Sequence, residues 1–102
     1  LRGGGLAVRS GNPGPPCGTI VRPMNPLHLE TPLFESQALS RISGRPIWLK
    51  LEAVQPPGSF KIRGIGLACR EYARRGARRF ISSSGGNAGI AVAYAGRKLG
   101  VP

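Results

Sequence analysis

Apolar residues recur at helical spacing in three stretches of the chain. The first runs from residue 31 up to residue 44, where Thr31 would be the N-cap and Pro32 the first helical residue. The second spans residues 60–75, and the third is an Ala-rich stretch over residues 90–99. Each stretch is followed by a glycine, the residue that most often closes a helix, and these are Gly44, Gly76 and Gly100. The pattern therefore predicts three helices.

Two shorter stretches predict strands. Residues 46–52 are typical of a strand buried on both faces, as the strands of a parallel sheet are, and residues 79–82 predict a short second strand. Strand and helix then alternate through the second half of the chain. The sequence thus predicts an α/β fold: part of a doubly wound parallel sheet with the element order βαβα.

Residues 1–23 show neither pattern. They contain no acidic and no aromatic residue and are rich in Gly and Pro, so we expect a disordered leader. Residues 24–102 would then form a truncated domain, with the natural translation start near Met24. No stretch approaches the ~20 apolar residues of a membrane span, which favours a cytoplasmic protein without membrane contact. A mitochondrial transit segment is the alternative, because the leader carries arginines and no acid.

The net charge of +11 raises the possibility of nucleic-acid binding. Much of this charge lies at the end of the second predicted helix and just beyond it, where basic residues complement the helix dipole. These residues are Arg70, Arg74, Arg75, Arg78 and Arg79. A solvated helix end explains them, so we expect no nucleic-acid partner.

Cysteine and histidine are too few and too scattered for a metal site or a disulfide framework. Cys17 and Cys69 lie far apart, and His28 is the only histidine. Cys69 falls within the second predicted helix, where we expect a small buried thiol.

Lys61 lies at a position that is unfavourable for a lysine. Pro56, Pro57 and Gly58 mark a turn, and Ser59 is a suitable N-cap, so Lys61 falls in the first turn of a helix. The positive end of the helix dipole disfavours a cation there by ~0.3–1 kcal/mol and favours the neutral, nucleophilic amine. A lysine that forms a Schiff base needs such an environment.

A loop of small residues, 82–89, precedes the third predicted helix. Backbone N–H groups at a helix start can bind an anion, and glycines allow it to approach closely. The glycine spacing fits neither the dinucleotide-binding pattern nor the P-loop. In a parallel sheet this loop and Lys61 would share one edge, and an amine beside an anion site suits an amino-acid substrate. Taken alone, the loop is more typical of a capped helix start, and its combination with Lys61 is what favours the anion site.

Three motifs together closely resemble one enzyme family. They are Pro-Pro-Gly-Ser-Phe-Lys-Ile-Arg-Gly at 56–64, Ser-Ser-Gly-Gly-Asn-Ala-Gly at 83–89 and Glu-Thr-Pro-Leu at 30–33. The resemblance covers residues 26–102 and is to the serine dehydratase and threonine deaminase family. These are pyridoxal-phosphate enzymes of fold type II, the fold of the tryptophan synthase β-subunit.

The resemblance implies the roles of the site residues. Lys61 would carry pyridoxal 5'-phosphate as a Schiff base and move the substrate's α-proton, while Phe60 would pack against the cofactor ring. Asn87 would hydrogen-bond the phenolic oxygen of the cofactor. The substrate carboxylate would be received by Ser84, Gly85, Asn87 and Ala88, with no metal among them. The implied reaction converts L-serine or L-threonine to pyruvate or 2-oxobutyrate and ammonia, in a homodimeric parent enzyme.

In the family, the phosphate-binding glycine loop, the partner of the ring nitrogen and the cation site all lie further along the chain. We therefore expect residues 1–102 to be an N-terminal fragment of such a lyase. The alternatives are a catalytically silent truncated product, a related β-replacement enzyme or a basic nucleic-acid-binding module. This chain has Gly85 at a position where the liver serine dehydratases carry Ser or Ala. In this respect it departs from those members of the family.

Overall fold

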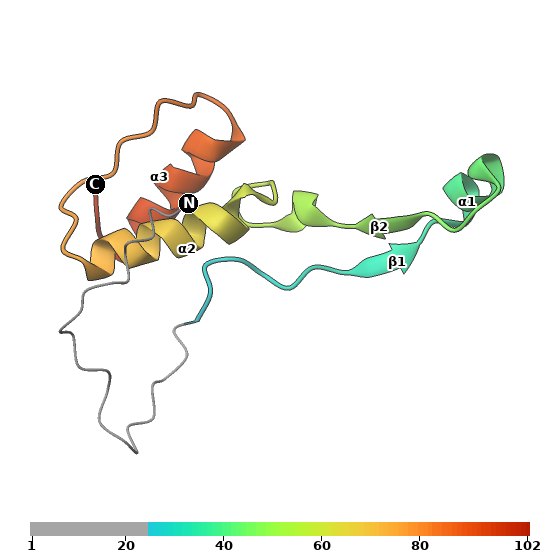
Figure 1. Cartoon of the computed structure of the whole chain (residues 1–102), viewed down its shortest axis with the longest axis horizontal. Coiled ribbons are helices and arrows are strands. Elements are labelled where there is room, and N and C mark those ends of the chain that lie inside the picture. Colours follow the sequence, from blue (N-terminus) through green and yellow to red (C-terminus); the bar gives the residue numbers. More distant parts are fainter. Residues whose placement is uncertain (1–24) are drawn as a thin grey trace, which may run out of the picture.

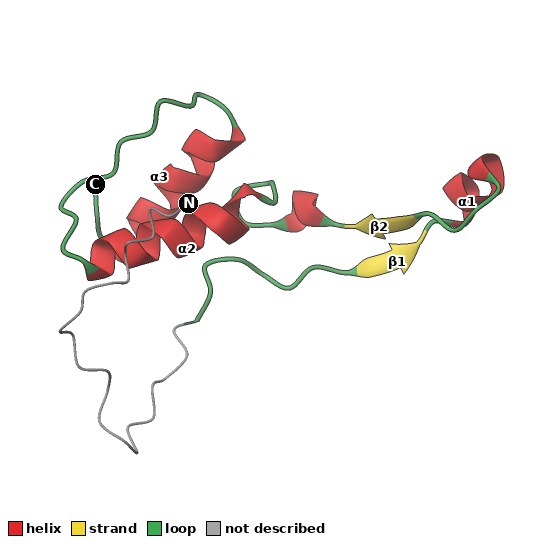
Figure 2. Ribbon diagram, in the orientation of Figure 1, coloured by secondary structure: helices red, strands yellow, loops and turns green. Residues whose placement is uncertain are grey.

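The structure, a computed structural model, describes residues 25–102 (Figure 1). The predicted leader and Cys17 lie outside these residues. The elements are, in chain order, β1 (Leu33–Glu35), α1 (Gln37–Ser43), β2 (Trp48–Lys50), the 3₁₀ helix η2 (Glu52–Val54), α2 (Lys61–Arg74) and α3 (Asn87–Leu99). They form two parts: an arm that carries the strands and α1, and a body that consists of α2 and α3 (Figure 2).

The arm is a two-stranded antiparallel ribbon with α1 at its tip (Figure 2). Phe34 of β1 lies opposite Leu49 of β2. Ser36 caps α1 by accepting a 3.3 Å hydrogen bond from the backbone N–H of Leu39. Gly44 ends the helix in the left-handed conformation, with φ of 72°, as predicted.

Two predictions for the arm are wrong. The helix predicted from Thr31 begins only at Gln37, because residues 33–35 pair with β2 and Ser36 provides the cap. The strand predicted over 46–52 exists as β2, but it pairs antiparallel and is not buried on both faces. The side chain of Trp48, for example, is 59% exposed.

The second predicted strand is also wrong. Residues 79–82 form no strand and belong to the loop between α2 and α3. The Phe80 N–H donates one backbone hydrogen bond of 2.8 Å to the Pro102 carbonyl. No parallel sheet occurs among residues 25–102, because β2 pairs with β1 rather than with residues 79–82.

The body is held together by contacts between α2 and α3. Its core consists of Ile62 and Cys69 from α2 and Ala91 and Ala95 from α3. Cys69 is the small buried thiol that the sequence predicted, and burial raises the pKa of this thiol. The small side chains of α3 allow α2 to approach closely, so this core fixes how the two helices lie against each other.

α2 and α3 end just before the glycines that the sequence predicted to close them. Gly76 has φ of 91°, and its N–H donates to the Ala73 carbonyl, while the Ala77 N–H reaches back to Tyr72. Gly100 closes α3 with φ of 70°. The C-terminal ends of the helices are therefore the part of the fold that the sequence predicted best.

The arginine cluster is partly paired at the C-terminal end of α2. Glu71 Oε1 lies 2.8 Å from Arg74 Nη2 and 2.7 Å from Arg75 Nε. These pairs hold the pKa of Glu71 at about 2, below its ordinary value, mainly through the hydrogen bonds from Arg74.

No helix within residues 25–102 has the length and apolar character needed to cross a membrane.

Candidate active site

Lys61 is the first residue of α2 and so lies in the first turn of a helix, as the sequence predicted. The predicted N-cap, however, is wrong. Phe60 occupies the N-cap position with helical dihedral angles, and no side chain caps the helix. Ser59 is instead buried, at 7% exposure, and its hydroxyl has no hydrogen-bond partner among the residues that the structure describes.

The amine of Lys61 lies beside an aromatic ring. Lys61 is exposed, and its Nζ lies 5.2 Å from the centroid of the Phe60 ring. Phe60 is itself 57% exposed, so a large part of its ring is free of protein contacts. No carboxylate of residues 25–102 forms an ion pair with Lys61. The amine is therefore accessible, and a flat ligand could pack on the aromatic ring next to it.

The start of α3 has the properties of an anion site. Asn87 and Ala88 are its first two residues, Gly86 is the N-cap, and the first turn contains no acidic residue and no side-chain cap. The Ser84 hydroxyl accepts a 3.2 Å hydrogen bond from the Gly86 N–H. A Cβ at Gly85 would meet no atom within 4 Å, so the space beside this residue is open. Uncapped N–H groups and the helix dipole both favour an anion here.

Gly89 brings the preceding loop over the start of α3. A Cβ at this position would clash with the backbone carbonyl of Ser84. Because the clash would be with backbone, no side-chain rotation could relieve it. Glycine at position 89 therefore allows the loop to fold close to the helix.

The two candidate regions lie at the same end of the body, the end from which the arm extends. α2 and α3 pack against each other, and Figure 1 shows both helices beginning at the same end. The sequence predicted this meeting at the edge of a parallel sheet, which the described residues lack. Here the packing of α2 against α3 puts the two helix starts at the same end of the body. The positive ends of both helix dipoles therefore lie at that end.

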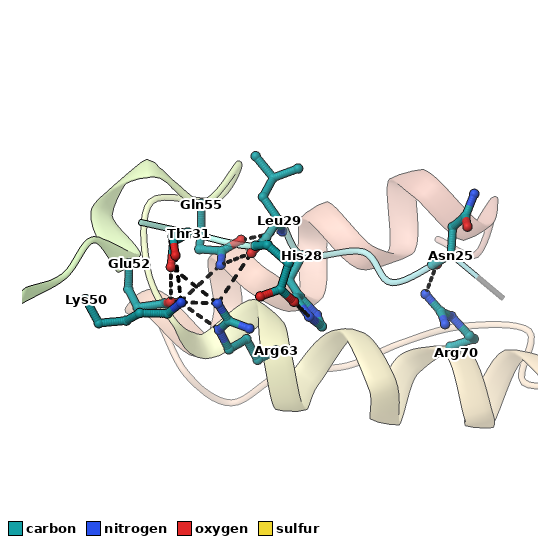
Figure 3. A network of polar contacts seen from close by, with 10 residues as sticks. Asn25, His28, Leu29, Thr31, Lys50, Glu52, Gln55, Arg63 and Arg70 are labelled. Carbon is teal, nitrogen blue, oxygen red and sulfur yellow. Dashed lines mark hydrogen bonds and ion pairs between the residues drawn. The ribbon is translucent and has the colours of Figure 1, made fainter. Parts of the chain in front are cut away.

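Sequence reasoning missed a polar network next to Lys61, which we call the clasp (Figure 3). It consists of Thr31, Glu52, Gln55 and Arg63, with the backbone of Leu29. Arg63 donates from Nε to Glu52 Oε2 at 3.0 Å and from Nη2 to Oε1 at 2.8 Å. The Thr31 hydroxyl donates to Glu52 Oε1 at 2.7 Å. The clasp thus joins three segments that are distant in the sequence.

Gln55 completes the clasp. Gln55 is buried, at 3% exposure, and forms two 2.8 Å hydrogen bonds with the backbone of Leu29: its Oε1 accepts from the N–H, and its Nε2 donates to the carbonyl. A third bond, of 3.1 Å, runs from its amide to Glu52. A polar residue between an apolar stretch and a Pro-Pro turn was the only sequence signal for this role.

Hydrogen bonds set the charge state of Glu52. Donation from Arg63 and then from Thr31 lowers the pKa of its carboxyl to about 2. The same pair raises the pKa of Arg63. The clasp therefore contains a full ion pair at neutral pH.

His28 and the acidic residues form no metal site in the described part of the chain. His28 Nε2 lies 3.8 Å from Glu30 Oε1, and the Glu30 side chain is largely exposed. No group of three or more His, Cys, Asp or Glu residues gathers within residues 25–102.

Comparisons with known proteins match most of the described chain. The family model described as "Pyridoxal-phosphate dependent enzyme" matches residues 24–102. Over 77 residues, the chain is 64% identical to human "Serine dehydratase-like" and 57% identical to bovine "L-serine dehydratase/L-threonine deaminase". Each match covers 76% of this chain but only 23% and 24% of the relative, so the chain spans about a quarter of their length.

A solved structure supports the same assignment. The crystal structure of a fungal L-serine ammonia-lyase from Rhizomucor miehei matches with a TM-score of 0.68 and 42% sequence identity. The match covers 74% of this chain and 24% of that one. The predicted resemblance to part of a fold type II enzyme is confirmed, although the described residues contain only the antiparallel ribbon as a sheet.

Proposed function

Because this chain belongs to the family of pyridoxal-phosphate dependent enzymes, we propose that it is the lysine-bearing part of an L-serine/L-threonine ammonia-lyase. The reaction would release ammonia and give pyruvate from L-serine or 2-oxobutyrate from L-threonine. The observation that carries the proposal is the exposed amine of Lys61 beside Phe60, at the end of the body where α3 begins uncapped. The names of the relatives supply the substrate class.

The residues present fit pyridoxal 5'-phosphate. When bound, the cofactor supplies an aldehyde that reacts with a lysine amine and a ring that withdraws electrons from the substrate. Lys61 would hold it covalently, and Phe60 offers an exposed aromatic face against which a planar ring can pack. The Asn87 amide can donate a hydrogen bond to an oxygen on such a ring.

The start of α3 would orient the substrate. Its uncapped N–H groups, with the Ser84 hydroxyl and the open space at Gly85, suit a carboxylate better than a neutral group. Asn87 and Ala88 contribute the first N–H groups of the helix. Once the substrate's amine had replaced that of Lys61 on the cofactor, the freed lysine amine could take the α-proton as a general base.

Covalent labelling tests this proposal directly. The chain is incubated with pyridoxal 5'-phosphate, treated with borohydride, digested and mapped by mass spectrometry. The chain has three lysines, so Lys50 and Lys98 serve as internal references. We expect label mainly on Lys61 and loss of that label in Lys61→Ala. Equal labelling of all three lysines in the folded chain would contradict the assignment of Lys61.

A second candidate is a polypeptide without catalytic activity of its own. The chain spans about a quarter of its relatives, and the core of the described residues consists of only four side chains. This candidate predicts that residues 1–102 release no ammonia from L-serine even where Lys61 is labelled. Ammonia release by this chain alone, lost in Lys61→Ala, would refute it.

The alternative of a β-replacement enzyme predicts turnover of the amino-acid substrate only when a nucleophile is added.

Location and assembly complete the proposal. We place the parent enzyme in the cytoplasm as a homodimer without a nucleic-acid partner, on the resemblance to serine dehydratases. Cell fractionation and the mass of the native enzyme by light scattering test these points. A mitochondrial fraction or a monomer would contradict them.

A further inference from the structure

The loop that carries Lys61 is fastened at both of its ends. Gln55 immediately precedes residues 56–62, and Arg63 immediately follows them. Both side chains bind Glu52, and both also bind the Leu29 carbonyl, at 2.8 Å from Gln55 and 3.4 Å from Arg63. The clasp therefore closes this loop in the way that a single cross-link would.

Within the loop, the backbone leaves little freedom between these fastened ends. The Gly58 N–H donates a 2.7 Å hydrogen bond to the Gln55 carbonyl, and Gly58 adopts φ of 81°. The two prolines before it have fixed φ angles. The Arg63 N–H bonds back to the Phe60 carbonyl at 3.0 Å. Lys61 thus begins α2 from a loop whose path is set by the clasp.

The clasp acts on Lys61 through the backbone and not by contact. Two residues apart on a helix correspond to a rotation of ~200°, so Lys61 and Arg63 point to opposite sides of α2. The clasp side faces segment 25–31, which runs along α2 in Figure 3. The contacts are Asn25 with Arg70, Leu27 with Gly66, and Leu29 with Arg63. The opposite side is left for the amine.

We propose that the clasp of Thr31, Glu52, Gln55 and Arg63 positions Lys61 for covalent attachment of the cofactor. The inference rests on the proposed function and adds positioning residues to it. Arg63 and Glu52 are the central pair. They bind each other, and each also binds segment 25–31: Glu52 through Thr31 and Arg63 through the Leu29 carbonyl. Breaking the pair leaves partly buried polar groups without partners, so the loop would rearrange.

The test measures how selectively Lys61 reacts. The ratio of label on Lys61 to label on Lys98 is determined after pyridoxal 5'-phosphate and borohydride treatment of the whole chain. Lys98 is an apt reference, because its amine also lies over an aromatic ring, 5.7 Å from the centroid of Tyr94. We expect Arg63→Gln and Glu52→Gln each to lower the ratio roughly tenfold, as for loss of a charged hydrogen-bond pair. The double variant should fall no further.

Matched controls are available at the other end of the same helix. Arg74→Gln and Glu71→Gln make the same chemical changes in a more exposed ion pair and should leave the ratio unchanged. Gly66→Ala disturbs the packing of α2 against Leu27, since its Cβ would lie 3.3 Å from the Leu27 Cβ, without touching the loop ends. Crowding against Leu27 opposes the gain in helix propensity, so thermal stability reports the balance of the two, and the ratio should stay unchanged.

A spectroscopic signature separates positioning from folding. Visible circular dichroism of the attached cofactor reports whether it is held in one orientation, while far-ultraviolet circular dichroism reports the helices. Arg63→Gln should lose the visible signal and keep the helical one. If it unfolds, Thr31→Val is the milder change: it removes the hydroxyl that donates to Glu52 at 2.7 Å and accepts from Arg63 at 3.4 Å, and it should lower the ratio about threefold.

The outcomes distinguish the two levels of the argument. If Lys61 is selectively labelled but the clasp variants keep the native ratio and visible signal, the inference is overturned and the proposed function stands. If the native chain shows no preference for Lys61, the proposed function fails, and the inference fails with it. If Gly66→Ala lowers the ratio as much as the clasp variants do, the inference is also overturned, because altered packing of α2 alone would explain the fall.

Discussion

At the scale of single residues, replacing either of two glycines near the start of α3 by alanine should have different effects on stability. A Cβ at Gly89 would clash with the backbone carbonyl of Ser84, whereas one at Gly85 would meet nothing within 4 Å. We expect Gly89→Ala to lower the free energy of unfolding by ~1–3 kcal/mol, as overpacking does. Gly85→Ala should change it by less than about 0.5 kcal/mol. Urea titration followed by circular dichroism measures both.

The Gly89 substitution should also affect the candidate anion site. Because the clash is with backbone, the loop must move, and Ser84 moves with it. Selective labelling of Lys61 should survive in Gly89→Ala, since α2 is not involved. Equal stability of the two glycine variants would show that the loop does not lie over α3 as described.

At the scale of elements, the sequence predicted local features and missed distant ones. Gly76 and Gly100 close helices through hydrogen bonds to residues a few positions away, so their roles are visible in a short stretch of sequence. The partner of β2 is set by long-range pairing, which the apolar pattern of 46–52 does not encode. Local pattern therefore predicted the helices, whereas it predicted the wrong sheet.

The same distinction applies to the candidate site. Lys61 and the loop before α3 were predicted because each has a local chemical signature, a lysine at a helix start and small residues before a helix. The clasp was missed because Glu52 and Arg63 are ordinary charged residues in sequence. Only the fold shows that one carboxylate binds both Thr31 and Arg63. Positioning residues of this kind are recognised by their partners and not by their type.

Helix α2 carries an acid-sensitive ion pair near each end. The pKa values of Glu52 and Glu71 are about 2 in the folded protein, below their ordinary value of 4.5. Because both are lowered, the unfolded chain binds more protons in acid. Their contribution to stability is complete above about pH 4.5 and is lost as the pH falls toward 2.

Glutamine variants test this acid dependence. The urea midpoint of the native chain should fall between pH 6 and pH 3 by more than that of Glu52→Gln or Glu71→Gln, in which one titrating group is absent. The double variant should fall least. Identical acid dependence in all four proteins would contradict the lowered pKa values.

At the scale of the whole molecule, the arm exposes apolar side chains that the body does not cover. Ile42 is 83% exposed, and Trp48 is 59% exposed on β2. The arm makes no contribution to the core formed by α2 and α3 within the described residues. We therefore expect the arm to add little to the stability of the body.

Trp48 is the only tryptophan of the chain and reports on the arm alone. In dilute solution its fluorescence should be readily quenched by acrylamide and should change little in urea, while circular dichroism follows the loss of α2 and α3. The physical reason is that a largely exposed indole already contacts water before unfolding. At high protein concentration, apolar arms should associate, shift the emission to shorter wavelength and reduce quenching, and Ile42→Ser should weaken this effect. Strong protection of Trp48 that does not depend on concentration would contradict the exposed arm.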